Sequence, residues 1–404
     1  MSGLGREVNL SEVCDTITYG YTASATNINT ETKFLRITDI VPSQIDWESV
    51  PYCEIDLNNL AKYKLQVGDI VIARTGATTG WNKTIKSLPY PTVYASYLIK
   101  YSINREIANP FYVGYNLRSS KWYDYVDAIA GGSAQPGANA KQLGSFNFNL
   151  PLLPEQKAIA SVLSSLDNKI DLLHRQNKTL ESMAETMFRQ WFIEEAQEDW
   201  KEISLDQIFD FLEGPGIRNW QYVSSGINFI NIRLISNGEI FVSKANKISK
   251  EEALGKYIHF MLKEDDFVLS TSGTLGKSAI VRSYHLPLCL NTSVIRFRPK
   301  SKLYREFMYS YLSSRKFLDE VENSASGSVQ LNFGPTHIKN ITLYLPDPDT
   351  LMKYHTSSKP IFDKIKSNFQ QINCLEHLRD TLLPKLMSGE VRVQYAEEKI
   401  ESVA

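Results

Sequence analysis

The sequence predicts an α+β protein made of two tandem copies of one module, each followed by a long helix. Three observations predict this fold. The chain matches itself at an offset of 195 residues, each copy holds short β-rich runs between turns, and an apolar heptad pattern follows each copy. We expect the two helices to form an antiparallel coiled coil, which would give the chain an internal pseudo-twofold symmetry.

Composition limits the class of protein. With 404 residues, 43% hydrophobic and 22% charged, the chain is globular and long enough for two or three domains. No apolar run approaches the roughly 18 residues of a spanning helix, and the N-terminus lacks a signal pattern, so we expect a cytoplasmic protein with no membrane partner. Its four cysteines never form Cys-x-x-Cys, which indicates reduced thiols. The net charge of −1 is low for a nucleic-acid binder, but the acidic excess falls in the presumed helices.

The internal repeat keeps apolar and charged positions in step over most of the chain. Both modules end in an alternating run stopped by proline, at Pro151 and Pro346, as expected of a half-buried strand. The best-matched segments are 6–13 with 201–208, 34–37 with 229–232, 132–135 with 327–330, and 146–151 with 341–346.

The middle of each module predicts a buried strand followed by a glycine-rich turn. Asp69–Ile72 and Asp266–Leu269 are short β-rich runs, and the turns 74–80 and 271–276 follow them. The modules also contain expected helices, such as Pro110–Tyr125 and Tyr304–Glu322. Each module is therefore predicted to be a compact α+β domain of roughly 145 residues.

The helix after the first module carries apolar residues at spacings of three and four over about 42 Å, and the positions 195 residues later repeat the stripe. Packing the helices together would bury both stripes. Asn177 and Asn368 fall in the seam, where they either fix its register or mark a solvated edge. The expected seam residues are Leu166, Ile170, Leu173, Asn177, Leu180, Met187, Ile361, Ile365, Asn368, Ile372, Leu375 and Leu382.

These patterns divide the chain into five parts. The two modules are expected at 1–150 and 198–346, the two helical regions at 151–197 and 347–392, and a tail at 393–404. Only about eight residues separate the first helix from the second module. We therefore expect the second module at the far end of that helix.

Catalytic motifs are missing. A phosphate loop spanning Gly276 and Lys277 would need glycine where Thr271 stands, so a tight turn is the better interpretation. The sequence has no Gly-x-Gly-x-x-Gly after a strand and no His-Glu-x-x-His, and its six histidines show no ligand spacing. We expect no catalytic residue, metal or cofactor in this chain.

Two helical segments resemble a known family. Leu150–Ala160 (LPLLPEQKAIA) and Leu166–Ile170 (LDNKI) are similar to the first conserved region of type I restriction-modification specificity subunits, and Leu382–Val391 (LLPKLMSGEV) is similar to the end of the second. The second copy departs from the pattern, since Asp349–Leu351 replaces Pro154–Gln156.

The resemblance implies two target-recognition domains that alternate with two conserved helical regions. It implies a non-catalytic subunit that binds a bipartite, gapped target in double-stranded DNA. It also implies two methyltransferase subunits that bind S-adenosylmethionine and two restriction subunits that use ATP and Mg²⁺. Half-sites read in neighbouring major grooves lie about 34 Å apart, comparable with the proposed helix pair, which would act as a ruler.

Polar loops are the candidates for DNA contact, because base edges need donors and acceptors held on a rigid base. The alternative is that the glycines only shape turns and the polar side chains only position the backbone. The candidates are Tyr21, Arg74, Thr75, Lys83, Gln135, Asn139, Lys141 and Gln142 in the first module, and Arg218, Asn219, Trp220, Ser272, Lys277, Gln330, Asn332 and His337 in the second. On the first helix, Glu155, Gln156, Lys169 and Arg175 are either docking sites for a methyltransferase or ordinary solvated residues.

Two other functions are compatible with parts of the pattern. A repeat-built protein–protein scaffold without DNA binding would also suit the near-neutral charge and the coiled coil, but it should show no salt-dependent DNA affinity. A self-contained modification enzyme would bind S-adenosylmethionine by itself, which the missing cofactor motifs disfavour.

Overall fold

The computed structural model describes residues 5–42, 44–131, 137–271, 276–325 and 334–393. The chain forms two compact units. Unit 1 comprises residues 1–172 and 372–404, and unit 2 comprises residues 173–371. Each unit therefore holds one module and one half of each long helix. No helix in the described ranges combines the length and apolar content needed to span a membrane.

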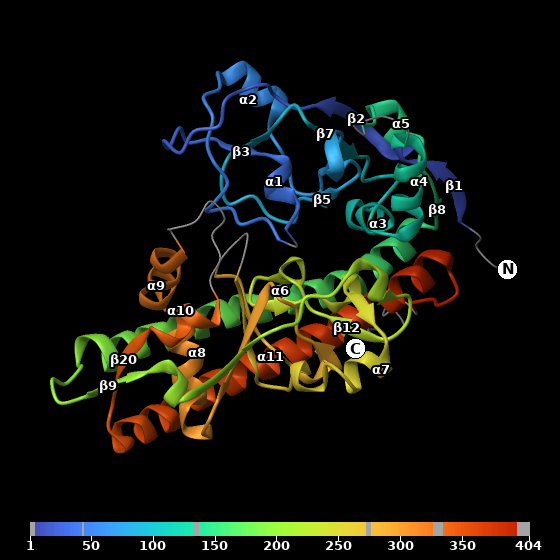
Figure 1. The fold of residues 1–404 in the computed structure, drawn as a ribbon. Helices are drawn as coiled ribbons and strands as arrows, with labels where there is room; N and C mark the ends of the chain where they lie inside the picture. Colours follow the sequence, from blue (N-terminus) through green and yellow to red (C-terminus); the bar gives the residue numbers. More distant parts are fainter. Residues whose placement is uncertain (1–4, 43, 132–136, 272–275, 326–333, 394–404) are drawn as a thin grey trace, which may run out of the picture. The chain divides into compact units, whose positions relative to one another are not determined.

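The module in unit 1 is built around a four-stranded antiparallel sheet of order β2-β7-β4-β5. Two further pairs flank it, β1 with β8 antiparallel and β3 with β6 parallel (Figure 1). The elements are β1 (Arg6–Asn9), β2 (Cys14–Tyr19), β3 (Lys33–Leu35), α1 (Ile37–Ile40), α2 (Leu57–Tyr63), β4 (Ile70–Ala73), β5 (Asn82–Thr84), β6 (Thr92–Tyr94), β7 (Leu98–Ile103), α3 (Pro110–Asn116), α4 (Ser120–Ala130), α5 (Ala140–Gly144) and β8 (Asn147–Leu150).

The module in unit 2 has the equivalent antiparallel sheet, of order β10-β19-β16-β17, and the equivalent pair β9 with β20. The strands are β9 (Lys201–Ser204), β10 (Phe209–Glu213), β11 (Tyr222–Val223), β12 (Ile227–Phe229), β13 (Ile235–Ser236), β14 (Glu239–Ile240), β15 (Asn246–Ile248), β16 (Phe267–Ser270), β17 (Ser278–Ile280), β18 (Leu288–Cys289), β19 (Val294–Pro299) and β20 (Thr342–Leu345). The helices are α7 (Lys250–Leu254), α8 (Arg305–Ser313), α9 (Arg315–Ala325) and α10 (Pro335–Lys339).

The internal repeat is confirmed at the level of strand register. In unit 1, Val8 of β1 pairs with Phe148 of β8. In unit 2, Ile203 of β9 pairs with Leu343 of β20, and both partners are displaced by the same 195 residues. The two copies therefore share a hydrogen-bonded frame, and the duplication extends beyond sequence.

The central strand of each sheet is buried on both faces, which explains its unbroken apolar run. In β4, Ile70 and Ile72 join the core formed with α3 and α4, whereas Val71 and Ala73 join the core on the opposite face. In β16, Phe267 likewise enters the helix-side core and Val268 the other one. Both predicted strands are confirmed, and a continuous apolar run is the expected sequence of such a strand.

The prediction of one continuous helix over 110–125 and of another over 304–322 is wrong. The region 110–125 forms two helices, α3 and α4, and the region 304–322 forms α8 and α9. Serine is the physical reason, because its side chain caps a new helix N-terminus. The Ser119 side chain accepts a hydrogen bond from the Trp122 N–H at 3.4 Å, and the Ser314 side chain accepts one from the Phe317 N–H at 3.3 Å.

The long helices α6 (Leu153–Arg189) and α11 (Pro348–Ser388) pack against each other within each unit (Figure 1). In unit 1, Leu163 near the start of α6 shares a core with Leu386 near the end of α11. In unit 2 the roles are exchanged, because Phe188 near the end of α6 packs on Tyr354 near the start of α11, with ring centroids 6.4 Å apart. The antiparallel pairing is therefore confirmed in both units. The spatial pseudo-twofold axis stays a prediction.

The predicted seam is the buried face of both helices. Seven of its twelve members are buried and five are half-buried, as expected for a stripe that faces a partner helix. The buried members are Ile170, Leu173, Asn177, Ile361, Ile365, Asn368 and Ile372, and the half-buried members are Leu166, Leu180, Met187, Leu375 and Leu382.

The two seam asparagines contact each other in unit 2. The Asn368 side-chain amide donates a hydrogen bond to the Asn177 side-chain oxygen at 2.8 Å, and the residues are 0% and 3% exposed. The solvated-edge interpretation is therefore wrong. The remaining amide nitrogen of Asn177 and the oxygen of Asn368 are buried without a partner among the described residues. Such a pair costs stability but favours the one register in which both amides meet.

Replacing one asparagine should cost more than replacing both. Asn177→Leu leaves the Asn368 amide buried and unpaired, and we expect the free energy of unfolding to fall by about 1–3 kcal/mol. The double variant Asn177→Leu/Asn368→Leu removes both polar groups and should be at least as stable as the parent. Urea unfolding measures both effects, with the exposed Asn168→Leu as control. Equal losses in the single and double variants would contradict the paired arrangement.

Candidate nucleic-acid interface

The two loops predicted to read DNA in the first module lie side by side at one end of its sheet. Thr75, in the turn after β4, forms an antiparallel bridge with Gly137. The Ala138 N–H donates a hydrogen bond to the Arg74 carbonyl at 2.9 Å. Gly76 adopts φ +75°, so a left-handed turn directs the chain here and glycine suits it. The structure therefore joins the loop of Arg74 and Thr75 with the loop that leads into α5.

Tyr19, at the end of β2, belongs to the same surface and was missed by sequence reasoning. Its ring lies 4.9 Å from the Arg74 guanidinium carbon, within the range of a cation–π contact. Its hydroxyl accepts a hydrogen bond from the Ala140 N–H at 3.1 Å. The side chain is still 42% exposed. The signal in the sequence was an aromatic residue at a strand end directly before Gly20.

Asn139 and Gln142 have a structural task at the start of α5. The Asn139 side chain accepts from the Gln142 N–H at 2.9 Å, and the Gln142 side chain accepts from the Asn139 N–H at 3.0 Å. These two reciprocal hydrogen bonds form a capping box that fixes the loop geometry. They support the alternative in which both side chains position the backbone and do not contact DNA. Lys141 lies between them on the exposed side, and Gln135 lies outside the described residues.

Lys83 and Tyr21 lie outside the two loops just described. Lys83 is in β5, where burial and the nearby Arg118 and Lys86 charges lower its pKa to about 8, against the opposing effect of Asp167 and others. Its side chain thus lies near charged residues of the module and of α6, among them Asp167 on that helix, which does not support the expected DNA contact. Tyr21 packs on Tyr63, with ring centroids 5.3 Å apart, and its N–H donates to the Tyr94 carbonyl.

In the second module, Arg218, Asn219 and Trp220 are all exposed, around the short 3-10 turn Asn219–Gln221. Trp220 is 79% exposed, which is unusual for so large an apolar ring and suits a contact surface. The Arg218 N–H is held by the Gln221 side-chain oxygen at 2.9 Å, which fixes the turn. These three predicted residues therefore form one exposed group.

The other candidates of the second module are only partly described. Lys277 is half-buried, and its N–H donates to the Ser270 hydroxyl at 3.0 Å. The His337 ring nitrogen Nδ1 accepts from the Gly334 N–H at 3.1 Å at the start of α10. Ser272, Gln330 and Asn332 lie outside the described residues.

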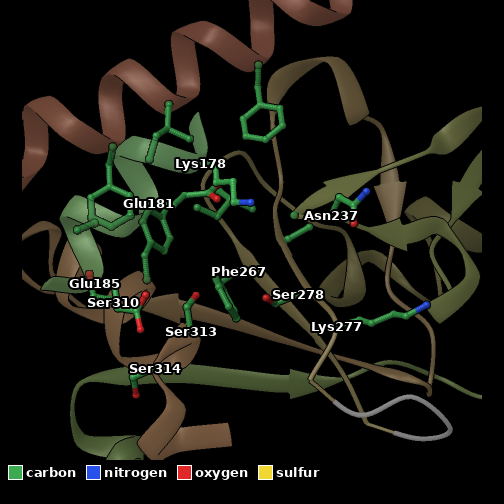
Figure 2. Close-up of a pocket in the computed structure, with 18 of the residues that line it drawn as sticks. Lys178, Glu181, Glu185, Asn237, Phe267, Lys277, Ser278, Ser310, Ser313 and Ser314 are labelled. Carbon is green, nitrogen blue, oxygen red and sulfur yellow. The ribbon is translucent and has the colours of Figure 1, made fainter. Parts of the chain in front are cut away.

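A cavity of about 620 Å³ opens beside the Gly276–Lys277 turn, inside unit 2 (Figure 2). Figure 2 shows Ser310 and Ser313 from α8 and Ser314 just after it on the cavity wall, with Lys277 extending away from them. The buried cation in its wall, Arg282, lies 4.2 Å from the Phe369 ring centroid and 3.9 Å from the Glu239 carboxylate. Its charge is thus engaged by the protein itself, which indicates a structural role. Among the described residues, no group of three or more His, Cys, Asp or Glu side chains could hold a metal ion.

One predicted partner contact on α6 is wrong. Gln156 is only 1% exposed, and its side chain accepts from the Asn109 N–H and donates to the Pro151 carbonyl, both at 2.8 Å. It therefore pins the start of α6 to the module and cannot reach a partner. Glu155 is half-exposed, and Lys169 and Arg175 are exposed, so all three remain candidates for docking.

Comparison with known proteins identifies the family. The family model for the type I restriction modification DNA specificity domain matches residues 6–182 and again residues 197–379. This chain belongs to the type I restriction-modification specificity family. The two matches coincide with the two copies of the internal repeat, each extending into the helix that follows it. The expected non-enzymatic role is confirmed by this membership, because the family supplies specificity and not catalysis.

Curated relatives of this specificity-family chain carry the same description. The MjaIX specificity subunit of Methanocaldococcus jannaschii is 27% identical over 70% of this chain and 69% of that protein. The putative MjaX specificity subunit of the same organism is 24% identical over 95% and 93%. Among solved structures, the type I restriction-modification S subunit from M. genitalium aligns with a TM-score of 0.55 at 16% identity, covering 95% of this chain and 96% of that one. This last likeness shows the shared fold.

Proposed function

We propose that this chain is the DNA-reading subunit of a type I restriction-modification complex and that each module reads one half of a bipartite, gapped target in double-stranded DNA. The observation that carries the proposal is the duplicated frame, in which β1 with β8 and β9 with β20 pair in the same register 195 residues apart. Two equivalent modules in one chain suit two half-sites. Different loops on the same frame suit two different sequences.

The paired helices would set the gap between the half-sites. At 1.5 Å per residue, the 37 residues of α6 extend about 55 Å, which exceeds the roughly 34 Å between neighbouring major grooves on one face of DNA. The asparagine pair supports this role, because a fixed register gives a fixed length. A gap of constant size is therefore expected in the target.

The chemistry of the complex would reside on partner chains. We propose that two methyltransferase subunits supply S-adenosylmethionine-dependent methylation and that two restriction subunits supply ATP- and Mg²⁺-dependent cleavage. The exposed Lys169 and Arg175, with the half-exposed Glu155, lie on the solvent side of α6, where a partner could dock. No residue of this chain is assigned a catalytic step.

The test is to co-express the full chain with its cognate methyltransferase subunit in a host that lacks this methylation, and to map modified bases by single-molecule sequencing. We expect one gapped, two-part motif that is methylated only when both chains are present. A host genome without any such motif would refute the proposal.

Salt dependence separates this function from a protein–protein scaffold. The complex with the methyltransferase should lose DNA affinity steeply as salt rises, because phosphate contacts release counterions. The exposed Lys141 and Arg218 are cationic side chains in the loops that would contribute to such a slope. A scaffold would show neither the slope nor a preferred sequence.

A further inference from the structure

Three strand ends meet at one end of the sheet in unit 1. There β2 ends at Tyr19, β4 is followed by Arg74, and β7 is preceded by Tyr97. Because β7 is antiparallel to both of its neighbours, these three positions share one edge of the sheet. The Arg74 N–H donates to the Tyr97 carbonyl at 3.1 Å, which closes the edge. Tyr97 is 58% exposed, so the edge faces solvent.

The same edge exists in unit 2 with different side chains. Strand β2 pairs with β7 up to Tyr19 opposite Ile99, and β10 pairs with β19 up to Glu213 opposite Ile295. Glu213 therefore takes the place of Tyr19.

Two more positions of that edge correspond as well. The Thr271 N–H donates to the Ser293 carbonyl at 3.0 Å, as the Arg74 N–H does to the Tyr97 carbonyl. Thr271 thus takes the place of Arg74, and Ser293 that of Tyr97. The edge in unit 1 therefore carries one arginine and two tyrosines. The corresponding edge in unit 2 carries one glutamate and two residues with hydroxyl groups.

The frame behind these edges is kept, so the change is confined to the surface. In both modules an aspartate before the central strand accepts a backbone hydrogen bond from three residues earlier. Asp69 accepts from the Gln66 N–H at 2.8 Å, and Asp266 accepts from the Lys263 N–H at 2.7 Å. Two residues after that aspartate, a valine is fully buried in both modules, Val71 in one and Val268 in the other. Positions that build the sheet agree between the copies, whereas positions at its edge differ in charge.

The Arg74 guanidinium is held in place by the protein around it. The Tyr19 ring lies 4.9 Å from its central carbon, and its Nε is buried without a hydrogen-bond partner among the described residues. In unit 2, Thr271 is fully buried and cannot contact DNA, whereas the charged Glu213 is partly exposed at the equivalent edge. Burial raises the pKa of Glu213, because its carboxylate has lost part of its contact with water. A hydrogen-bond donor from a bound molecule would stabilise that carboxylate.

We propose that Arg74 and Glu213, which lie at different positions of the corresponding edges of the two modules, are specificity-determining residues, and that each fixes one G·C pair in its own half-site. Arginine donates two hydrogen bonds to guanine O6 and N7, and glutamate accepts one from the cytosine N4 amino group. Tyr19 is a positioning residue that acts by holding Arg74. The proposal rests on the proposed function, since it assigns side chains to the reading of that same DNA target.

The experiment maps methylation motifs for variants of the full chain co-expressed with the methyltransferase. Arg74→Lys keeps the charge but loses the two-pronged geometry, and it should relax one G·C position of the first half-site by about tenfold to a hundredfold. Glu213→Gln should relax one G·C position of the other half-site by a similar factor. Tyr19→Leu should reproduce the effect of Arg74→Lys, whereas Tyr19→Phe should restore the parental motif. Arg105→Lys, beyond the opposite end of β7, is the matched control and should change nothing.

Each outcome has a distinct meaning. If the parent gives no two-part motif, the proposed function itself fails. If the parent gives such a motif but Arg74→Lys and Glu213→Gln leave both halves unchanged in chains that unfold at the parental temperature, the assignment of these residues is wrong. It is also wrong if either variant relaxes both halves equally, since that would indicate a general loss of binding.

Discussion

Gly20→Ala should destabilise unit 1 by about 3 kcal/mol, at the upper end of the cost of overpacking. A β-carbon at residue 20 would lie 2.2 Å from the Ala95 carbonyl oxygen and 2.4 Å from that of Tyr94. Backbone atoms cannot rotate away as a side chain can, so the strand end must move. That movement would also strain the hydrogen bonds from Gly20 to Leu98 and from Tyr21 to Tyr94.

Gly214→Ala is the equivalent change in unit 2. Its β-carbon would lie 2.5 Å from backbone atoms of Asn291, so the same cause operates at the same place in the second copy. Because Gly20 and Gly214 follow Tyr19 and Glu213, each substitution should also disturb reading of one half-site only.

Chemical unfolding and motif mapping test these glycine substitutions together. Gly334→Ala is the control, because a β-carbon there meets no atom of the described residues within 4 Å, and it should cost about 1 kcal/mol or less. A loss for Gly20→Ala as small as that of the control would show that the close approach is absent in solution. A loss of both halves of the motif would show that the modules do not act separately.

The duplicated fold was predictable because its signals are local and repeated. Strands β4 and β16 were predicted from unbroken apolar runs. The seam of α6 and α11 was predicted from a heptad spacing that recurs 195 residues later. The spacing of apolar residues reflects the geometry of the helix or strand that carries them. It can therefore be recognised without knowing which other segment packs against that element. The helix breaks at Ser119 and Ser314 were missed, because a serine cap inside a continuing periodic pattern is too weak a signal in isolation.

The site was less predictable, because it depends on which segments meet. Composition marked Arg74 and the glycine-rich loops, but nothing near Tyr19 in the sequence indicates that its ring lies beside Arg74, 55 residues away. Conversely, Gln156 looked like a surface residue of an amphipathic helix, and its burial follows from backbone groups at Asn109 and Pro151. Contacts between segments distant in the sequence therefore explain both errors, the failure to predict Tyr19 and the wrong prediction for Gln156.

Asp167 shows the same dependence on distant partners, and its removal should give the other large effect. It lies on α6, is 5% exposed, and accepts hydrogen bonds from Arg118 at 2.8 Å, Arg379 at 3.2 Å and the Tyr115 hydroxyl at 2.9 Å. These partners come from the first module and from α11, so one carboxylate joins three parts of unit 1. Lys86 Nζ lies 3.6 Å away and adds a further positive charge.

Asp167→Asn should lower the free energy of unfolding by about 3–5 kcal/mol, because three cations would then face each other without a buried counter-charge. Asp380→Asn is the matched control. It removes the exposed ion pair of the same Arg379, at 2.9 Å, and should cost less than about 1 kcal/mol. Urea unfolding of the full chain near neutral pH measures both. If Asp167→Asn lowered the free energy of unfolding as little as Asp380→Asn does, Asp167 and its cationic partners would be exposed to water in solution.

The acid dependence of stability gives an independent measurement on the same group. Burial alone would raise the pKa of Asp167, but the charge and hydrogen bond of Arg118, with help from Lys86 and Tyr115, lower it from 3.8 to about 2. A carboxyl whose pKa is lower in the folded state stabilises the fold fully above pH 4, and this contribution is lost as the pH falls toward 2. The loss should amount to about 2 kcal/mol in the parent and should vanish in Asp167→Asn. An identical acid profile for the two proteins would place the titrating group elsewhere.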